Sequence, residues 1–295
     1  MTAPLRFALG SFGLGVLVLG LKAAAWRVSG SAALYSDALE SLVNVFAALM
    51  VFYALKTAAK PADFEHPYGH AKAELLSAMA EGGLIVLAAV LILQRAAETI
   101  FAPHLPAAPW LGLALNASGG VLNALWAAVL SRSGASRRYP ALAADQAHLI
   151  ADAITTIGIV IGLSLAVLAD IPILDPLIAV AIAIQIAVIG GRTILRSLSL
   201  LLDRAPPPDI VERIRSLVAI HATGALEAHD MRMRQAGRSS FLEFHLVVPG
   251  EMAVADAHEI CDRIEAALKT EMSGVIITIH VEPDHKAKHQ GVLVV

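Results

Sequence analysis

The sequence predicts a membrane domain of six transmembrane helices followed by a small cytoplasmic α+β domain. The 295 residues are 57% hydrophobic and only 16% charged, which is too apolar for an ordinary soluble protein. Six apolar stretches reach the ~20 residues that a bilayer-spanning helix needs. They are 7–28, 32–56, 77–101, 110–131, 141–168 and 173–198. Residues 206–295 lack such a stretch and contain seven of the eleven histidines, which indicates a separate soluble domain.

Segments with proline and glycine separate the six stretches. The clearest is "LDRAPPPD" at 202–209, where three consecutive prolines cannot continue a helix. We therefore expect a membrane domain over 1–204, a soluble domain over 205–284 and a tail over 285–295.

Lysine and arginine in the short links predict the orientation, because cytoplasmic links of membrane proteins are enriched in both. They lie in the links after the second and fourth stretches and at the exit from the sixth: Lys56, Lys60, Lys72, Arg132, Arg137, Arg138, Arg192, Arg196 and Arg204. The links after the third and fifth stretches have none. We therefore expect both termini and the soluble domain in the cytoplasm. The single cysteine, Cys261, fits a reducing compartment, and no basic patch indicates nucleic acid.

The soluble domain has the predicted order αββαβ. A helix begins near Asp209, two strands of period two follow ("ALEAHDMRMRQAG" and "RSSFLEFHLVV"), then a helix ("ADAHEICDRIEAALKTEM") and a β-branched strand ("GVIITIHVEP"). We expect a three-stranded sheet covered on one face by two helices. Residues 285–295 are expected to form a loose tail.

Polar side chains form two stripes on otherwise apolar helices. Asp37, Glu40 and Asn44 share one face of the second stretch, and His148 and Asp152 lie one turn apart on the fifth. An ionisable group at the bilayer centre costs at least ~2.5–3.5 kcal/mol, so we expect both stripes to face inward. Apart from Asp37, the stripes supply one imidazole nitrogen from His148 and three oxygens from Glu40, Asn44 and Asp152. This is a tetrahedral set suited to Zn²⁺. The alternative is a polar clamp between helices without metal.

A second candidate site lies in the link after the second stretch, in "DFEHPYGHAKAE". Asp63, His66 and His70 can meet around one ion, because Pro67 and Gly69 shape a tight turn between the histidines. The alternative is that these residues only cap helices and line a loop near the lipid headgroups.

A third candidate site lies in the soluble domain. Period-two alternation places His245 on one face of its strand, and His280 and Glu282 on one face of the last strand. His229 lies on a third strand and His258 on a helix. Histidine is the commonest metal ligand, so the pattern favours a metal site over a set of surface histidines.

These stretches resemble the cation diffusion facilitator family, and its bacterial zinc/iron branch most closely. The resemblance covers nearly the whole chain, through "SDALESLVN", "HPYGHAKAE", "HLIADA", "LLDRAPP", "HDMRMRQAG", "FHLVV", "DAHEICDRIE" and "IHVEP". It implies a homodimer in the bacterial inner membrane that exchanges a divalent metal for protons. It also implies that the soluble domain is similar to small αββαβ metallochaperones.

The resemblance assigns roles to individual residues. The transport site maps to Glu40, Asn44, His148 and Asp152, the loop site to Asp63, His66 and His70, and a cytoplasmic binuclear site to His229, His245, His258, His280 and Glu282. A charge interlock at the dimer contact maps to Lys72 and Asp203. Much of the branch has Asp where this chain has Glu40 and Asn44, so Asn44 removes one negative charge and one titratable group. Asp37 could compensate only if its helix rotated.

A histidine ligand argues against Mg²⁺ and Ca²⁺, which prefer oxygen. We expect Zn²⁺ or Fe²⁺ as the substrate, with Co²⁺, Ni²⁺, Cd²⁺ and Mn²⁺ as further candidates. No P-loop sequence is present, so ATP is not the expected driving force. Six apolar stretches and the lack of a nucleophile or base pair argue against an enzyme. The alternatives are a metal-responsive membrane scaffold or sensor that does not transport, and a member adapted to Fe²⁺.

Overall fold

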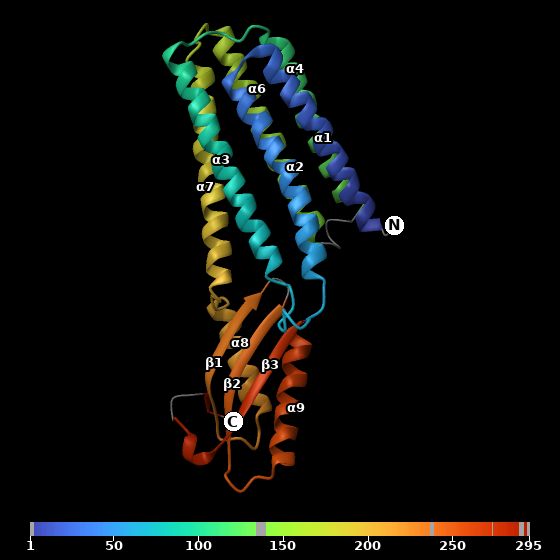
Figure 1. Ribbon diagram of the computed structural model, residues 1–295, viewed down its shortest axis with the longest axis vertical. Coiled ribbons are helices and arrows are strands. Elements are labelled where there is room, and N and C mark those ends of the chain that lie inside the picture. The colour runs from blue at the N-terminus through green and yellow to red at the C-terminus, as the bar shows by residue number, and fades with distance from the viewer. Residues whose placement is uncertain (1–2, 134–139, 237–238, 273, 289–291, 294–295) are drawn as a thin grey trace. The chain divides into compact units, whose positions relative to one another are not determined.

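The computed structural model describes residues 3–133, 140–236, 239–272, 274–288 and 292–293 (Figure 1). Six of its helices are long and apolar enough to cross a membrane. They are α1 (Ala3–Ser29), α2 (Ala32–Ala58), α3 (Ala73–Phe101), α4 (Pro109–Arg132), α6 (Pro140–Leu168) and α7 (Leu174–Leu201). The prediction of six apolar helices is therefore confirmed. Arg137 and Arg138, which support the predicted orientation, lie outside the described residues.

The chain forms two compact units. The first comprises Met1–Tyr53 and Ser77–Ile194, and the second comprises Ala54–Leu76 and Leu195–Val295. The loop between α2 and α3 therefore belongs to the same unit as the soluble domain. The domain division at residue 204 stays a prediction.

Small residues allow the helices of the first unit to pack closely. A Cβ atom on Gly120 of α4 would lie 2.7 Å from Cγ2 of Thr156 on α6. On α3 and α7, Cβ atoms on Gly82 and Gly190 would each lie 2.9 Å from the other residue's backbone oxygen. These glycines set how near the helices approach, which is how apolar membrane helices gain packing energy without a hydrophobic effect between them.

The N-terminus of α2 is capped by a residue of α7. The carboxylate of Asp175 accepts hydrogen bonds from Ser31 Oγ (2.6 Å), Ala32 N (2.8 Å) and Ala33 N (3.0 Å). The first N–H groups of a helix have no partner within the helix, and a negative charge there also interacts favourably with the helix dipole. Asp175 is buried, so this cap fixes the start of the helix that bears Asp37 and Glu40.

The second unit contains the predicted αββαβ order. Its elements are α8 (Pro208–His221), β1 (Glu227–Ala236), β2 (Ser239–Val248), α9 (Val254–Glu271) and β3 (Val275–Pro283). β1 and β2 are antiparallel, whereas β2 and β3 are parallel. Leu242, Phe244 and Leu246 of β2 are buried in one core with Ile214 of α8 and Ile264 of α9. Both helices therefore cover the same face of the sheet, as the alternation predicts.

The C-terminal residues differ from the expected loose tail. A short 3₁₀ helix, η1 (Asp284–Lys286), follows β3. β4 (Val292–Leu293) then pairs with β1 and extends the sheet order to β3-β2-β1-β4. The expectation of a structureless tail is therefore wrong for these residues. Their short apolar run covers the edge of β1 at Glu227 and Ala228, where the strand would otherwise present unpaired backbone groups.

Candidate metal centres

Three carboxylates from two helices meet in the first unit. Asp37 and Glu40 of α2 and Asp152 of α6 have ligand oxygens that all lie within 4.8 Å of one another. Asp37 and Asp152 are buried, and Glu40 is partly buried. The structure thus brings the two predicted polar stripes together, but through Asp37 as well as Glu40.

A lysine of α1, which belongs to neither predicted polar stripe, lies at the centre of this cluster. Lys22 of α1 is fully buried, and its Nζ lies 2.8 Å from Asp37 Oδ1 and 2.8 Å from Asp152 Oδ2. Asn123 of α4 also donates a hydrogen bond to Asp152 Oδ2. Thr156 of α6 donates to Asp37 Oδ2 at 3.3 Å. The one signal in the sequence is a lone lysine within the first apolar stretch, where a charge needs a partner.

Two oxygens of the cluster are not satisfied by the protein. Glu40 Oε2 and Asp152 Oδ1 are buried and have no hydrogen-bond partner within the described ranges. A buried polar atom without a partner costs free energy, and each such atom in a native structure requires an explanation. Both are carboxylate oxygens, which are donors suited to a cation.

The other two predicted ligands of this site lie differently. Asn44, one turn after Glu40 on α2, is partly buried. His148, one turn before Asp152 on α6, has an exposed side chain and is not within the carboxylate cluster. It interacts electrostatically with Glu81 of α3 instead. The role of His148 as a ligand stays a prediction, because binding would require its imidazole to turn inward.

The loop residues form a compact cluster in the second unit. Asp63, His66 and His70 have ligand atoms within 4.8 Å of one another. Asp63 Oδ1 lies 3.3 Å from His66 Nδ1, and Asp63 Oδ2 lies 3.4 Å from His70 Nε2. The backbone N–H of His66 donates to Asp63 Oδ1 at 2.7 Å, and this bond is the main cause that lowers the pKa of Asp63. The carboxylate therefore stays charged near neutral pH and can attract a cation.

The sheet residues form the third cluster, on the face opposite the helices. His229, His245 and His280 are direct neighbours across β1, β2 and β3. Adjacent ring centroids are 5.3 Å and 4.9 Å apart. Glu282 reaches all three, with carboxylate oxygens 3.4 Å from His229 Nε2, 3.2 Å from His245 Nδ1 and 3.6 Å from His280 Nε2. Ligand atoms of His229, His245 and Glu282 therefore lie within 4.8 Å of one another, and His280, whose side chain is largely exposed, lies at the edge of this group.

Two residues change the predicted composition of this cluster. His258 of α9 lies outside it, with an exposed side chain whose Nε2 is 3.8 Å from Asp262 Oδ1. Glu227, which is not among the predicted ligands, is buried with its Oε1 3.6 Å from His229 Nδ1. Glu227 and His229 are two apart on one strand, so period two was the available signal. A carboxylate behind a histidine orients the ring for a metal.

Lys72 and Asp203 form an ion pair within the second unit. Lys72 Nζ lies 3.0 Å from Asp203 Oδ1, and Arg234 lies 3.5 Å from the same oxygen. The Arg234 guanidinium also stacks over the rings of Phe241 and Tyr68, at 4.3 Å and 5.5 Å. The pairing of Lys72 with Asp203 is present in one chain, and its place at a dimer contact stays a prediction.

Asp203→Asn gives a pH-dependent loss of stability. The hydrogen bond from Lys72 is the main cause that lowers the pKa of Asp203 below its ordinary value of 3.8. The ion pair therefore stabilises the fold fully above that value, and its contribution disappears as pH falls through the lowered pKa. Asparagine tolerates the left-handed backbone at this position (φ 60°). The difference in melting temperature between wild type and variant should be small and constant near neutral pH and vanish in acid. A pH-independent difference would contradict the ion pair.

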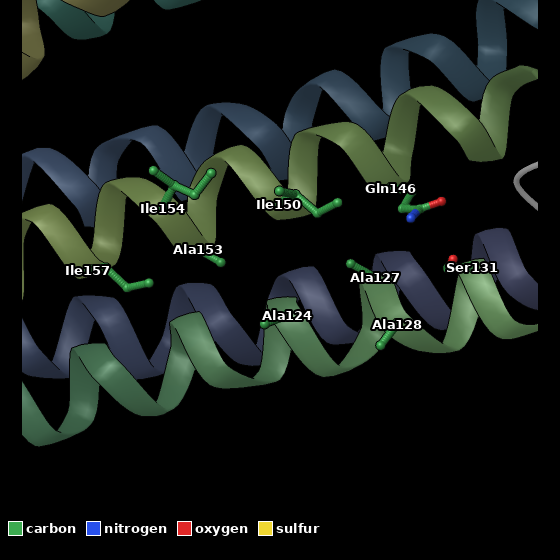
Figure 2. Close-up of a pocket in the computed structure, with 9 residues that line it drawn as sticks. All are labelled: Ala124, Ala127, Ala128, Ser131, Gln146, Ile150, Ala153, Ile154 and Ile157. Carbon is green, nitrogen blue, oxygen red and sulfur yellow. The ribbon is translucent and has the colours of Figure 1, made fainter.

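A shallow groove lies between α4 and α6 on the same unit as the carboxylate cluster (Figure 2). Its volume is about 420 Å³, and its walls are alanine and isoleucine side chains, with Ser131 and Gln146 near one end. Ile150, Ile154 and Ile157 are exposed and point away from the bundle interior. The groove has no metal-binding side chain among its lining residues, so it is not a fourth candidate centre.

Comparison with known proteins gives the family. Residues 9–202 match the cation efflux transmembrane domain, and residues 206–284 match the cytoplasmic domain of cation efflux proteins. The chain is 38% identical over 285 residues to the uncharacterized transporter sll1263 of Synechocystis, covering 96% of this chain and 92% of that protein. It is 30% identical over 273 residues to the cation-efflux pump FieF of Shewanella oneidensis, covering 92% of each.

Among solved structures, the zinc form of CzrB is 49% identical and covers 29% of this chain and 98% of its own, with a TM-score of 0.28. The expected family is therefore confirmed by matches that cover both halves of the chain. Its members are transporters and not enzymes. This chain belongs to the cation diffusion facilitator family and is a multi-pass membrane protein for the efflux of metal cations.

Proposed function

We propose that the protein exports Zn²⁺ or Fe²⁺ from the cytoplasm across a bacterial inner membrane in exchange for protons, with both termini in the cytoplasm. The observation that carries this proposal is the buried carboxylate cluster. Glu40 and Asp152 each bury an oxygen that has no partner among the described residues. In a membrane, ionisable groups that face the bundle interior mark the pathway of an ion.

The donor set supports a transition metal. The cluster offers two carboxylate oxygens without a partner among the described residues, and His148, one turn from Asp152 on α6, would add a nitrogen if its imidazole turned inward. An imidazole nitrogen beside carboxylates favours Zn²⁺ and Fe²⁺ over Mg²⁺ and Ca²⁺. Co²⁺, Ni²⁺, Cd²⁺ and Mn²⁺ accept similar donors and belong in any selectivity test.

Competition between protons and metal for the same atoms supplies the coupling. A carboxylate or imidazole lone pair that binds a proton cannot also bind a metal ion. Metal arriving from the cytoplasm displaces protons from Glu40, Asp152 and His148, and protons from the other side then release the metal. Rocking of helices around a fixed site would alternate its exposure.

The sheet cluster of the second unit serves as a cytoplasmic metal sensor in this proposal. Metal held by His229, His245, His280 and Glu282 would fix the sheets of a homodimer and favour one conformation. Transport would then respond to the cytoplasmic metal concentration. The loop cluster of Asp63, His66 and His70 would bind metal before it enters the membrane site.

Proton flux in proteoliposomes that contain a pH-sensitive dye tests the proposal. Zn²⁺, Fe²⁺ under anaerobic conditions, Co²⁺, Ni²⁺, Cd²⁺ and Mn²⁺ would each be added outside in turn. We expect saturable flux with Zn²⁺ or Fe²⁺ and weaker flux with the others. Retained metal binding without flux for any ion would instead indicate a metal-responsive scaffold or sensor.

A further inference from the structure

Contacts on several sides hold Lys22 within the carboxylate cluster. Its Nζ bridges Asp37 and Asp152 at 2.8 Å each, and its side chain is fully buried. Its stem lies along Gly119 of α4, where an added Cβ would meet Lys22 Cγ at 3.5 Å and Cε at 3.6 Å. These contacts along the aliphatic part of the side chain fix the position of the Lys22 ammonium group within the site.

The hydrogen bonds divide the cluster into used and free oxygens. Both oxygens of Asp37 have partners: Lys22 donates to Oδ1, and the Thr156 hydroxyl lies 3.3 Å from Oδ2 while also lying 2.9 Å from the backbone oxygen of Asp152. For Asp152, Lys22 and Asn123 hold Oδ2, and Oδ1 remains free. Within the cluster, the buried oxygens without a partner in the described part of the chain are therefore Glu40 Oε2 and Asp152 Oδ1, and neither belongs to Asp37.

The charges divide in the same way. The three carboxylates carry a formal charge of −3, and the ammonium of Lys22 reduces it to −2. Lys22 lies 2.8 Å from both Asp37 and Asp152, so its charge offsets one of these two carboxylates, and a metal ion at the free oxygens of Glu40 and Asp152 meets a net site charge of −2. A site charge of −2 matches a dication, even though Asn44 contributes no charge.

We infer that Lys22 is a positioning residue that sets the charge of the transport site and keeps Asp37 out of the metal's ligand shell. By holding Oδ2 of Asp152, it also directs Oδ1 of that carboxylate toward the metal. This inference deepens the proposed function and rests on it, since both concern the same site. It differs from a purely structural salt bridge, because it predicts opposite effects for the two partners of one ion pair.

The test compares Lys22→Met, Asp37→Asn and the double variant of the full chain in the zinc flux assay. Without Lys22, Asp37 becomes a third charged ligand, so KM falls by about tenfold or more and Vmax falls because release slows. Without the charge of Asp37, Lys22 repels the metal, so KM rises by about tenfold or more. The double variant restores a charge of −2, and its KM returns to within about threefold of wild type.

A structural salt bridge would give a different pattern. Both single variants would then raise KM or lower the amount of folded protein, and the double variant would not restore the wild-type KM; this result would overturn the inference. If Lys22→Met does not fold, the inference is still tested by the KM of Asp37→Asn and by whether adding Lys22→Met to that variant returns the KM to the wild-type value. If wild type shows no flux, the proposed function fails. In that case Zn²⁺ binding to the purified full chain is measured directly, and the transport site is identified as the binding event that Asp152→Asn abolishes. The affinity of that site should be higher than wild type in Lys22→Met, lower in Asp37→Asn and close to wild type in the double variant.

Discussion

Replacing Asp152 by asparagine reduces metal-dependent proton flux to the level of protein-free liposomes. Asp152 Oδ1 is a buried carboxylate oxygen without a partner in the described structure, and Oδ2 is held by Lys22 and Asn123. The asparagine keeps the shape of the side chain but removes the charge that offsets Lys22 and attracts the metal. Losing one unit charge from a buried site reduces metal affinity by about 100-fold or more. Flux should therefore disappear at metal concentrations that saturate the wild type.

Asp145→Asn is the matched control for this variant, because it makes the same chemical change on the same helix. Asp145 lies two turns before Asp152 and accepts a hydrogen bond from Ser11 Oγ at 2.5 Å, so it is not part of the carboxylate cluster. We expect it to retain flux. His245→Ala removes a ligand of the sheet cluster and should change the response to metal concentration while transport persists. Equal loss in Asp152→Asn and His245→Ala would contradict the division between transport and sensing.

Gly82→Ala and Gly190→Ala destabilise the membrane unit, whereas the same change one residue later does not. The Cβ of either alanine would lie 2.9 Å from a backbone oxygen of the opposite helix, and backbone atoms cannot move aside without separating α3 from α7. Such overpacking typically costs about 1–3 kcal/mol. Cβ atoms on Gly83 and Gly191 meet no atom within 4 Å. Alanine at those positions should stabilise the helix by up to about 1 kcal/mol.

Thermal unfolding of the purified chain in detergent measures both the expected loss and the expected gain of stability in one experiment. The melting temperatures of Gly82→Ala and Gly190→Ala should fall below wild type, and those of Gly83→Ala and Gly191→Ala should stay equal or rise. Because each pair consists of neighbouring residues in one helix, helix propensity cancels within the pair. Four variants with the same small shift would show that α3 and α7 do not meet as described.

Much of the fold follows directly from the sequence. Apolar length alone identifies the six long helices, because a backbone in lipid must satisfy its hydrogen bonds within each segment. Period-two alternation in β2 identifies the buried face of Leu242, Phe244 and Leu246. The alignment of His245 with His280 was not predictable in detail, because the register of parallel strands depends on tertiary packing.

The candidate site was predictable only in part. The helical spacing of Asp37, Glu40 and Asp152 indicates polar faces, but spacing does not say which oxygen meets which partner. Lys22 lies 15 residues from Asp37 and 130 from Asp152 in sequence, so no local pattern joins them. The cap that Asp175 places on α2 was unpredictable for the same reason, because it joins residues more than a hundred positions apart. Such contacts arise from helix packing.

The most direct test of the account is to record metal and proton movement together in proteoliposomes holding wild type or Asp152→Asn. One dye would report the metal and a second the internal pH. We predict that metal and protons move in opposite directions in a fixed ratio in wild type, and that both movements disappear in Asp152→Asn. Metal movement without proton movement, or coupled flux that survives in Asp152→Asn, would contradict antiport through the carboxylate cluster.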